Sequence, residues 1–355
     1  MDLELTDEQS LLAESVQQLL TKSSGPAAWP ALVDFGVLSI AAGEAEDVGA
    51  VELALIARAL GERLESAPVA DTAAALYATR SADGAFVELL ADRVMSLALL
   101  EPGGGWGLED LDTTIAIGAG GRASIDGHKT TMHAGMADAL LVLGDDRGAR
   151  RLAVVARDAA GVAIAPVEWI DESLEPGAVT MADVEVDGAA VLSAEATEAV
   201  LPRLLAIGAV IAAAEAAGAA SAVMELARQY ATERRQFGRT IGSFQALRHL
   251  LADMYVKQDS SWSTVLFAAA ALEDGTDDAL RTASVAKAYV SRAAQDVAQG
   301  ALQVFGGIAF TAEHPAHRFL RRILARGQQF GDARHHERAL GRALVDAPQP
   351  TGAVT

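Results

Sequence analysis

The chain has 355 residues, of which 51% are hydrophobic and 21% charged, and its formal net charge is −20. This length and hydrophobic content allow a sizeable core in one large domain or in two or three smaller units, and they exclude global disorder. Because there is no cysteine, disulfides, thiolate metal sites and cysteine nucleophiles are excluded as well. The acidic balance argues against general nucleic-acid binding, which needs a broad basic surface.

The N-terminal residues show no basic segment followed by an apolar one, so we expect no secretory signal, and a cytoplasmic location fits the lack of cysteine. The longest apolar stretch, residues 201–224, is interrupted by Arg203, Glu215 and Ser221. It therefore predicts a buried helix of a globular protein and no membrane span.

Residues 1–92 are expected to form an N-terminal helical domain. Thr6, followed by Glu8 and Gln9, predicts a capped start for the first amphipathic helix. Apolar residues at helical spacing predict further helices through residues 51–60 and 73–77.

Residues 93–193 show a different periodicity and are expected to form a middle β-domain. Short apolar runs are separated by clusters of glycine, aspartate and proline, and they lie at residues 94–100, 113–117, 139–143, 152–155 and 162–165. Several short strands with such turn residues between them predict a β-barrel or sandwich.

Residues 194–346 are expected to form a C-terminal bundle of the four-helix type, followed by a flexible tail at 347–355. A long alanine-rich helix covers 201–234, and an apolar stripe from Phe244 to Trp262 marks the second helix. Residues 276–278 are expected to cap the third helix, Pro315 to open a short one, and Asp332 to precede the last. The predicted class is an α+β multidomain fold.

Between the first two bundle helices lies the sequence R-R-Q-F-G, residues 234–238. Five arginines within about two dozen residues make a local positive patch in an acidic chain; they are Arg228, Arg234, Arg235, Arg239 and Arg248. Since arginine offers a planar fork of donors, a patch of this kind at a helix end suits a phosphate group.

Together with this patch, three other stretches resemble the acyl-CoA dehydrogenase family, and the resemblance spans nearly the whole chain. Residues 99–105 are similar to the family's T-E-P-x-A-G-S-D flavin loop, and residues 126–129 with Ala137 and Asp138 resemble its N-G-x-K and A-D pair. Residues 234–238 with Phe244 and Gln245 resemble its R-x-x-F-G motif. Residues 303–307 with Pro315 and Arg321 resemble its Q-x-x-G-G segment, and these last two matches are the specific ones.

The resemblance implies an FAD cofactor and an acyl-CoA substrate. It also implies that this chain contacts the diphosphate and adenosine of a cofactor held by a neighbouring subunit, through Arg234, Gln236, Phe237, Gln303, Gly306 and Gly307. An arginine would neutralise the diphosphate, and paired glycines would let the backbone approach closely. The plainer interpretation is that the arginines and the glycines merely end their helices.

The departures from the family pattern are as informative as the matches. The family's catalytic glutamate corresponds to Gly331, and the alternative base position in the first bundle helix corresponds to Gly208, so we predict no catalytic residue and no metal ligand in this chain. Where the family contacts the flavin ring, this chain has Leu100, Trp106 and Thr131, which offer poor hydrogen-bonding replacements.

His133 is the remaining candidate donor toward a flavin ring, although a lone histidine near a loop is more often a surface or structural residue. The pattern as a whole resembles the degenerate subunit of heteromeric α2β2 bacterial acyl-CoA dehydrogenases, including those of steroid side-chain degradation. That resemblance implies a partner subunit that supplies the base, with electron-transferring flavoprotein as the electron acceptor.

Two alternatives stay open. A self-sufficient homo-oligomer could use a shifted base, either Asp332 or Glu215, although the former also suits a helix N-cap and the latter a packing role. Alternatively, the chain could be a non-catalytic acyl-CoA binder or scaffold on the same fold.

Overall fold

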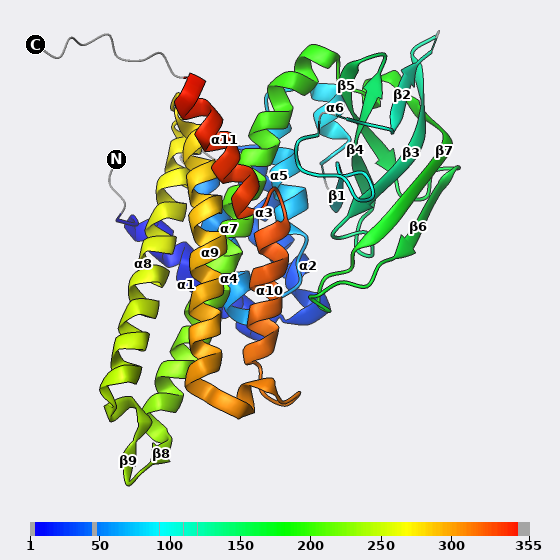
Figure 1. The fold of residues 1–355 in the computed structure, drawn as a ribbon. Helices are drawn as coiled ribbons and strands as arrows, with labels where there is room; N and C mark the ends of the chain where they lie inside the picture. Colours follow the sequence, from blue (N-terminus) through cyan, green and yellow to red (C-terminus); the bar gives the residue numbers. More distant parts are fainter. Residues whose placement is uncertain (1–3, 45–47, 92, 109, 119, 347–355) are drawn as a thin grey trace, which may run out of the picture.

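The computed structural model describes residues 4–44, 48–91, 93–108, 110–118 and 120–346, and its N-terminal part is helical (Figure 1). At the start of the first helix, Thr6 and Gln9 form the predicted capping box, in which each side chain accepts a hydrogen bond from the other's backbone N–H. The helices are α1 (Asp7–Lys22), α2 (Ala28–Phe35), α3 (Val37–Ala42), α4 (Ala50–Arg63), α5 (Val69–Thr79) and α6 (Gly84–Glu88).

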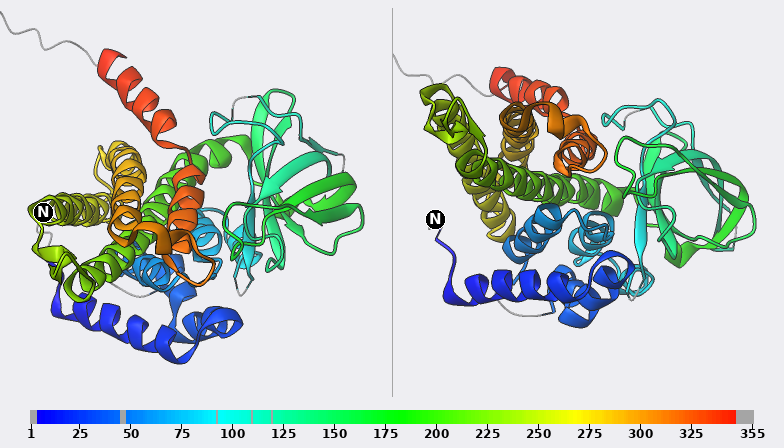
Figure 2. Two further views of the ribbon diagram at one scale, coloured as in Figure 1. Left: turned by 60° about the horizontal axis from the view of Figure 1, so that its bottom comes forward. Right: turned by 90° about the horizontal axis from the view of Figure 1, so that it is seen from below.

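The middle part of the chain is a curled seven-stranded sheet that forms a half-barrel beside the helices (Figure 2). Its order is β1-β4-β2-β3-β7-β6, with β5 paired to β4, and β1 runs parallel to β4. The strands are β1 (Met95–Ala98), β2 (Thr114–Ile117), β3 (Arg122–Thr131), β4 (Ala139–Asp146), β5 (Ala149–Ala156), β6 (Val162–Pro166) and β7 (Gly177–Asp187).

The strands β3 and β7 are the longest in the sheet and are absent from the sequence prediction. Polar residues and glycine interrupt their apolar pattern, and the register of β3 shifts between Ile125 and Gly127 where it pairs with β7. Alternation is nevertheless present in β7, where buried Val179, Met181 and Val184 are interspersed with exposed residues. The predicted mixed α+β class is confirmed.

The C-terminal bundle is built around α7, which crosses α4 at very short range. A Cβ atom on Gly61 would lie 1.9 Å from the carbonyl oxygen of Glu215, and one on Gly218 would lie 2.1 Å from that of Arg58, so only glycine allows this contact. The helices are α7 (Ala194–Glu233), α8 (Gln245–Glu273), α9 (Ala279–Phe305), α10 (Ala316–Gln328) and α11 (Ala333–Asp346).

One helix boundary and one helix cap differ from the prediction. The long helix α7 begins at Ala194, seven residues earlier than the predicted Leu201, because the Ser193 side chain caps it. The Asp278 side chain does not cap α9 and instead pairs with Arg281 at 2.5 Å. The helix α7 is long and apolar enough to cross a membrane by length and composition, but 89% of its most apolar window is buried inside the protein, as in a core helix.

The domain boundaries at 92/93 and 193/194 stay predictions, and the predicted tail at 347–355 lies outside the described residues.

Candidate functional site

The R-R-Q-F-G sequence forms a small hairpin at one end of the bundle (Figure 1). After α7 ends, β8 (Arg235–Gln236) pairs with β9 (Arg239–Thr240), and both turn residues, Phe237 and Gly238, have positive φ angles of 52° and 79°. The turn leaves Phe237 91% exposed. The sequence pattern did not predict these two strands, because each is only two residues long.

The Q-x-x-G-G segment lies at the same end of the bundle. Gln303 is exposed on the last turn of α9, Gly306 ends that helix with a φ of +67°, and Gly307 is exposed in the 3-10 turn that follows. The ring of Phe305 contacts Tyr230 near the end of α7, at a centroid distance of 5.4 Å. The fold therefore brings the six predicted cofactor-binding residues to one end of the bundle.

Only some arginines of the positive patch are available to bind an anion, because the others already contact neighbouring side chains. Arg228 is paired with Glu225 at 2.6 Å, and Arg239 lies over the ring of Phe244 at 3.9 Å. Arg234 and Arg235 are exposed, and within the described residues neither makes an ion pair. Arg248 is also exposed, but its Nε donates to the carbonyl of Gly242 at 3.1 Å. Arg234 and Arg235 are therefore the guanidinium groups of the patch most available to a phosphate at this end.

Where the loop after β1 passes β3, two motif residues 28 positions apart in sequence meet. The buried Nζ of Lys129 lies 2.6 Å from Glu101 and also donates to the carbonyl of Leu99. Burial lowers the pKa of Lys129, and the contact with Glu101 opposes that shift. Glu101 in turn accepts from the backbone N–H of Thr113, so this pair anchors the loop that resembles the flavin loop.

The residues expected beside a flavin ring are enclosed and face one another. His133 is fully buried, and its Nδ1 lies 3.1 Å from Asp71, although the angle is too poor for a hydrogen bond. Ser96 is also fully buried and hydrogen-bonds to both Asp71 and Thr131. The hydroxyl groups of Ser96 and Thr131 are therefore engaged with each other, whereas the buried Nε2 of His133 has no hydrogen-bond partner among the described residues.

The two positions that the sequence resemblance aligns with the family's base, Gly208 and Gly331, are closely surrounded by other side chains. A Cβ on Gly208 would lie 2.3 Å from the ring of Phe330. A Cβ on Gly331, which has a φ of +100°, would lie 2.7 Å from His335 and 2.8 Å from His336. The ring of Phe330 also contacts Trp106 at a centroid distance of 5.5 Å. Neither position has room for a carboxylate.

The Phe330–Gly331 segment is held from several sides. Trp106 donates its indole N–H to the carbonyl of Gln328 at 2.9 Å. Lys287, which is fully buried, donates to the carbonyl of Gly331 at 2.9 Å, and burial lowers the pKa of this lysine to about 7. His336 hydrogen-bonds through Nε2 to the carbonyl of Phe330 at 2.9 Å. These contacts hold the segment in the conformation in which the ring of Phe330 lies against Gly208.

The two candidate shifted bases are already engaged. Asp332 accepts from the backbone N–H of His335 at 2.7 Å and so caps α11. Glu215 is 1% exposed and lies 2.7 Å from Arg322 and 2.9 Å from Arg326. Both carboxylate oxygens of Glu215 are thus engaged by buried guanidinium groups, and the residue joins α7 to α10.

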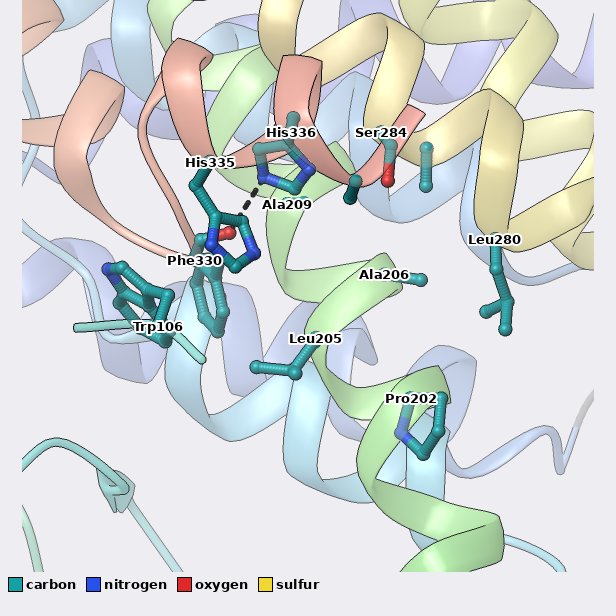
Figure 3. A pocket seen from close by; sticks show the side chains of 12 residues that line it. Trp106, Pro202, Leu205, Ala206, Ala209, Leu280, Ser284, Phe330, His335 and His336 are labelled. Atoms are coloured by element: carbon teal, nitrogen blue, oxygen red, sulfur yellow. Dashed lines mark hydrogen bonds between the residues drawn. The ribbon is translucent and has the colours of Figure 1, made fainter. Parts of the chain in front are cut away.

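A small cavity of about 160 Å³ lies beside this segment, between α7, α9 and α11 (Figure 3). Its wall includes Trp106, Leu205, Leu280, Phe330 and His335. Sequence reasoning identified Trp106 only as a departure from the flavin loop and did not identify His335 or His336. The sequence feature that could have identified these two residues is the pair of adjacent histidines in the first turn of the last helix.

A family model described as "Acyl-CoA dehydrogenase, C-terminal domain" matches residues 199–344. The acyl-CoA dehydrogenase IpdE2 of Mycobacterium tuberculosis is 31% identical over 306 residues, which are 78% of this chain and 91% of that protein. The IpdE2 of Mycolicibacterium smegmatis is 39% identical over 132 residues, so the match spans 37% of this chain and only 40% of that relative's length.

Solved structures share the fold over nearly the full length. A chain of the ChsE4-ChsE5 complex from Mycobacterium tuberculosis superimposes with a TM-score of 0.86 at 24% identity, covering 98% of this chain and 100% of that one. A chain of the Tcur3481-Tcur3483 steroid ACAD variant gives 0.85 at 24% identity, covering 96% and 98%.

Proposed function

The chain belongs to the acyl-CoA dehydrogenase family, and from that premise we propose that it is one subunit of a heteromeric, FAD-dependent acyl-CoA dehydrogenase. In this proposal it contributes to a flavin site shared with a partner subunit, and the partner supplies the base. The reaction is α,β-dehydrogenation of an acyl-CoA thioester, in which a base takes the α-proton and the bound flavin accepts hydride from the β-carbon.

The observation that carries the proposal is that neither position aligned with the family's base has a carboxylate or room for one. The α-proton of a thioester is weakly acidic, so the reaction needs a positioned proton acceptor. Gly208 and Gly331 offer none, and Phe330 occupies the space beside Gly208. Because Asp332 and Glu215 are engaged in a helix cap and in ion pairs, a self-sufficient enzyme with a shifted base is disfavoured.

The exposed end of the bundle supports a contact with a cofactor held elsewhere. Arg234 would neutralise part of the diphosphate, and Gln236 would contribute a side-chain amide. The exposed ring of Phe237 would pack beside the nucleotide. Around Gly306 and Gly307 the space next to each Cα is empty, which leaves room for the backbone to approach a phosphate, with Gln303 on the preceding turn.

The partner and substrate classes follow from the relatives. The ChsE4-ChsE5 and Tcur3481-Tcur3483 structures are named as pairs of different proteins, and the second is named a steroid enzyme. We propose an α2β2 assembly located in the cytoplasm, a steroid-derived acyl-CoA as substrate, and electron-transferring flavoprotein as the electron acceptor.

The test is to purify the full chain alone and together with a second acyl-CoA dehydrogenase chain that has an intact base. We expect no flavin on the chain alone, one flavin for every two chains in the complex, and acyl-CoA oxidation only by the complex. A chain that purifies alone with one flavin per subunit and oxidises an acyl-CoA would overturn the proposal. Acyl-CoA affinity without flavin under any pairing would instead indicate the non-catalytic binder.

A matched pair of variants tests the contact itself. Arg234→Ala should lower flavin retention in the complex, because the exposed guanidinium is removed from the diphosphate position. Arg228→Ala, on the last turns of the same helix, should retain the flavin, because Arg228 is already neutralised by Glu225. Equal flavin content in the two variants would contradict the assignment of Arg234.

A further inference from the structure

Lys287 on α9 is buried against the junction between α10 and α11 and holds that junction in place. Its side chain is fully buried, and within the described part of the chain it makes no ion pair. Its Nζ lies 2.9 Å from the carbonyl oxygens of Gly327 and Gly331, and 3.3 Å from the Oγ of Ser291. One side chain therefore fastens both ends of the junction to α9.

These three partners suit a neutral amine. The two carbonyl oxygens can only accept, and a neutral amine has two N–H donors for them, while its lone pair can accept from the hydroxyl of Ser291. A charged ammonium group also finds three acceptors here. Its charge would however be buried without a paired carboxylate, which is unfavourable.

Several charged or titratable groups face Lys287. Asp332, which precedes α11, favours the charged form, whereas Arg326 on α10 disfavours it. His335 and His336 on α11 also interact with it, and burial lowers the pKa of both rings, so they are mostly neutral at pH 7. Burial has the largest effect on Lys287 itself and lowers its pKa to about 7.

A polar groove between α9, α10 and the first turn of α11 offers the amine a second position. Its wall includes Ser291 and Gly327, which both bond to Lys287. The charged residues of the wall are Asp332, Arg292 and Arg334. Lys287 is thus one layer of residues away from the groove, where Asp332 carries the opposite charge.

We propose that Lys287 is a pH-sensitive latch of the α10–α11 junction. As a neutral amine it bonds to the junction carbonyls, and once protonated it turns into the groove toward Asp332 and frees the junction. The latch belongs to this chain's own bundle and does not rest on the shared flavin site, so either proposal can fail without the other.

The sign of the pH dependence follows from the two environments of the amine. In water its pKa is 10.5, and in the closed junction it is about 7. Between these values the open state binds one proton more than the closed state, so the closed state gains stability as the pH rises. Opening is favoured as the pH falls toward 7, and below that value the dependence ends.

Hydrogen exchange followed by mass spectrometry tests the latch on the full chain, in complex with its partner subunit if that is the form that purifies. For peptides covering residues 327–336, the opening constant, corrected for intrinsic exchange, should fall about fiftyfold between pH 7 and pH 9. Peptides from α7 should stay more protected at both pH values, because the opening is local. A constant that does not fall, or equal protection of the junction and α7, would overturn the proposal.

Two variants and one spectrum test the latch independently. Lys287→Met removes the titrating group, so the opening of the junction should no longer depend on pH; the same fiftyfold change would refute the latch. Asp332→Asn keeps an N-cap residue for α11 but removes the charge, so its junction should exchange more slowly than that of the parent chain at pH 7. Equal or faster exchange would refute the position in the groove.

The spectrum decides the matter on the unaltered protein if a variant fails to fold. Lys287 is one of four lysines in the chain, so its ¹³Cε resonance can be followed by NMR after lysine labelling. It should titrate with a midpoint near pH 7, and a midpoint near 10.5 would show that Lys287 is not the switch.

Discussion

Replacing Glu215 by glutamine separates a structural role of this residue from a catalytic one. Glu215 on α7 is paired with Arg322 and Arg326 on α10, and all three side chains are 2% exposed or less. Arg322 also donates to the carbonyl of Glu65 and to Asp171, so the cluster ties α4, α7, α10 and the loop before β7 together. Burial alone would lower the pKa of Arg322, but Glu215 and Asp171 outweigh it and raise that pKa.

The size of the effect follows from what the substitution leaves behind. In Glu215→Gln, Arg322 keeps Asp171 at 2.5 Å, whereas Arg326 keeps only the amide oxygen of Gln329. Removing one partner of a buried ion pair costs about 3–5 kcal/mol, because the other charge stays buried without compensation. With an unfolding entropy of about 2.1 cal/mol/K per residue, a chain of 355 residues should melt about 4–7 °C lower.

The assay is thermal unfolding followed by circular dichroism. Glu198→Gln is the control, because it makes the same change on the same helix in an exposed pair with Arg150, and such pairs contribute about 0–1 kcal/mol. The complex with the partner subunit should keep its turnover number in Glu215→Gln below the new melting temperature. An unchanged melting temperature together with lost turnover would refute the structural role and make Glu215 the shifted base.

Two further predictions concern the segment around Phe330. His336 has a pKa of about 4 in the folded chain against an ordinary value of 6.5, mainly because of burial, so the unfolded chain takes up the proton first as the pH falls. Denaturant unfolding should therefore show about 2 kcal/mol less stability from His336 at pH 5 than at pH 7, and His336→Leu should lack this part of the loss. Gly208→Ala should destabilise the chain by about 1–3 kcal/mol through overpacking against Phe330. Adding Phe330→Leu should recover part of that loss in a double-mutant cycle of melting curves, whereas additive losses would show that the two residues do not clash.

The helices were predictable from sequence where the signal was local and periodic. The capping box at Thr6 and the long run of small residues in α7 each lie within one element, and both are present in the structure. The strands β3 and β7 were not predictable in the same way, because their apolar alternation is broken by glycine and polar residues and their pairing with each other joins segments distant in sequence.

The parts of the candidate site also differ in how far the sequence alone reveals them, and sequence separation is again the reason. The residues around Arg234 and Gln303 lie in short contiguous motifs, so the sequence names them directly, and the fold places both motifs at one end of the bundle. The ion pairs of Arg322 with Glu215 and Asp171 join residues 107 and 151 positions apart. The sequence allows His133 to be either a surface residue or a structural one. The structure shows that it is buried, with Asp71 and Ser96 packed around it.

Restoring a glutamate at the lost base position should not restore activity, and the reason lies in the backbone. Gly331 has a φ of +100°, which a residue with a side chain rarely adopts, and its carbonyl is held by Lys287. A glutamate side chain there would begin within 3 Å of both His335 and His336. Gly331→Glu should therefore lower the melting temperature and leave the chain without its partner inactive in an acyl-CoA oxidation assay.

The matched control for this substitution is Gly341→Glu, because Gly341 lies on α11 with open space around its Cα and should tolerate the same side chain. If Gly331→Glu folded as stably as the parent chain and oxidised an acyl-CoA without a partner, the loss of the base would be a simple point change. The flavin ring would then have to find room among His133, Ser96 and Thr131. Since those residues are buried, and Ser96 bonds both to Thr131 and to the backbone N–H of His133, we expect Gly331→Glu alone to leave the chain dependent on a partner.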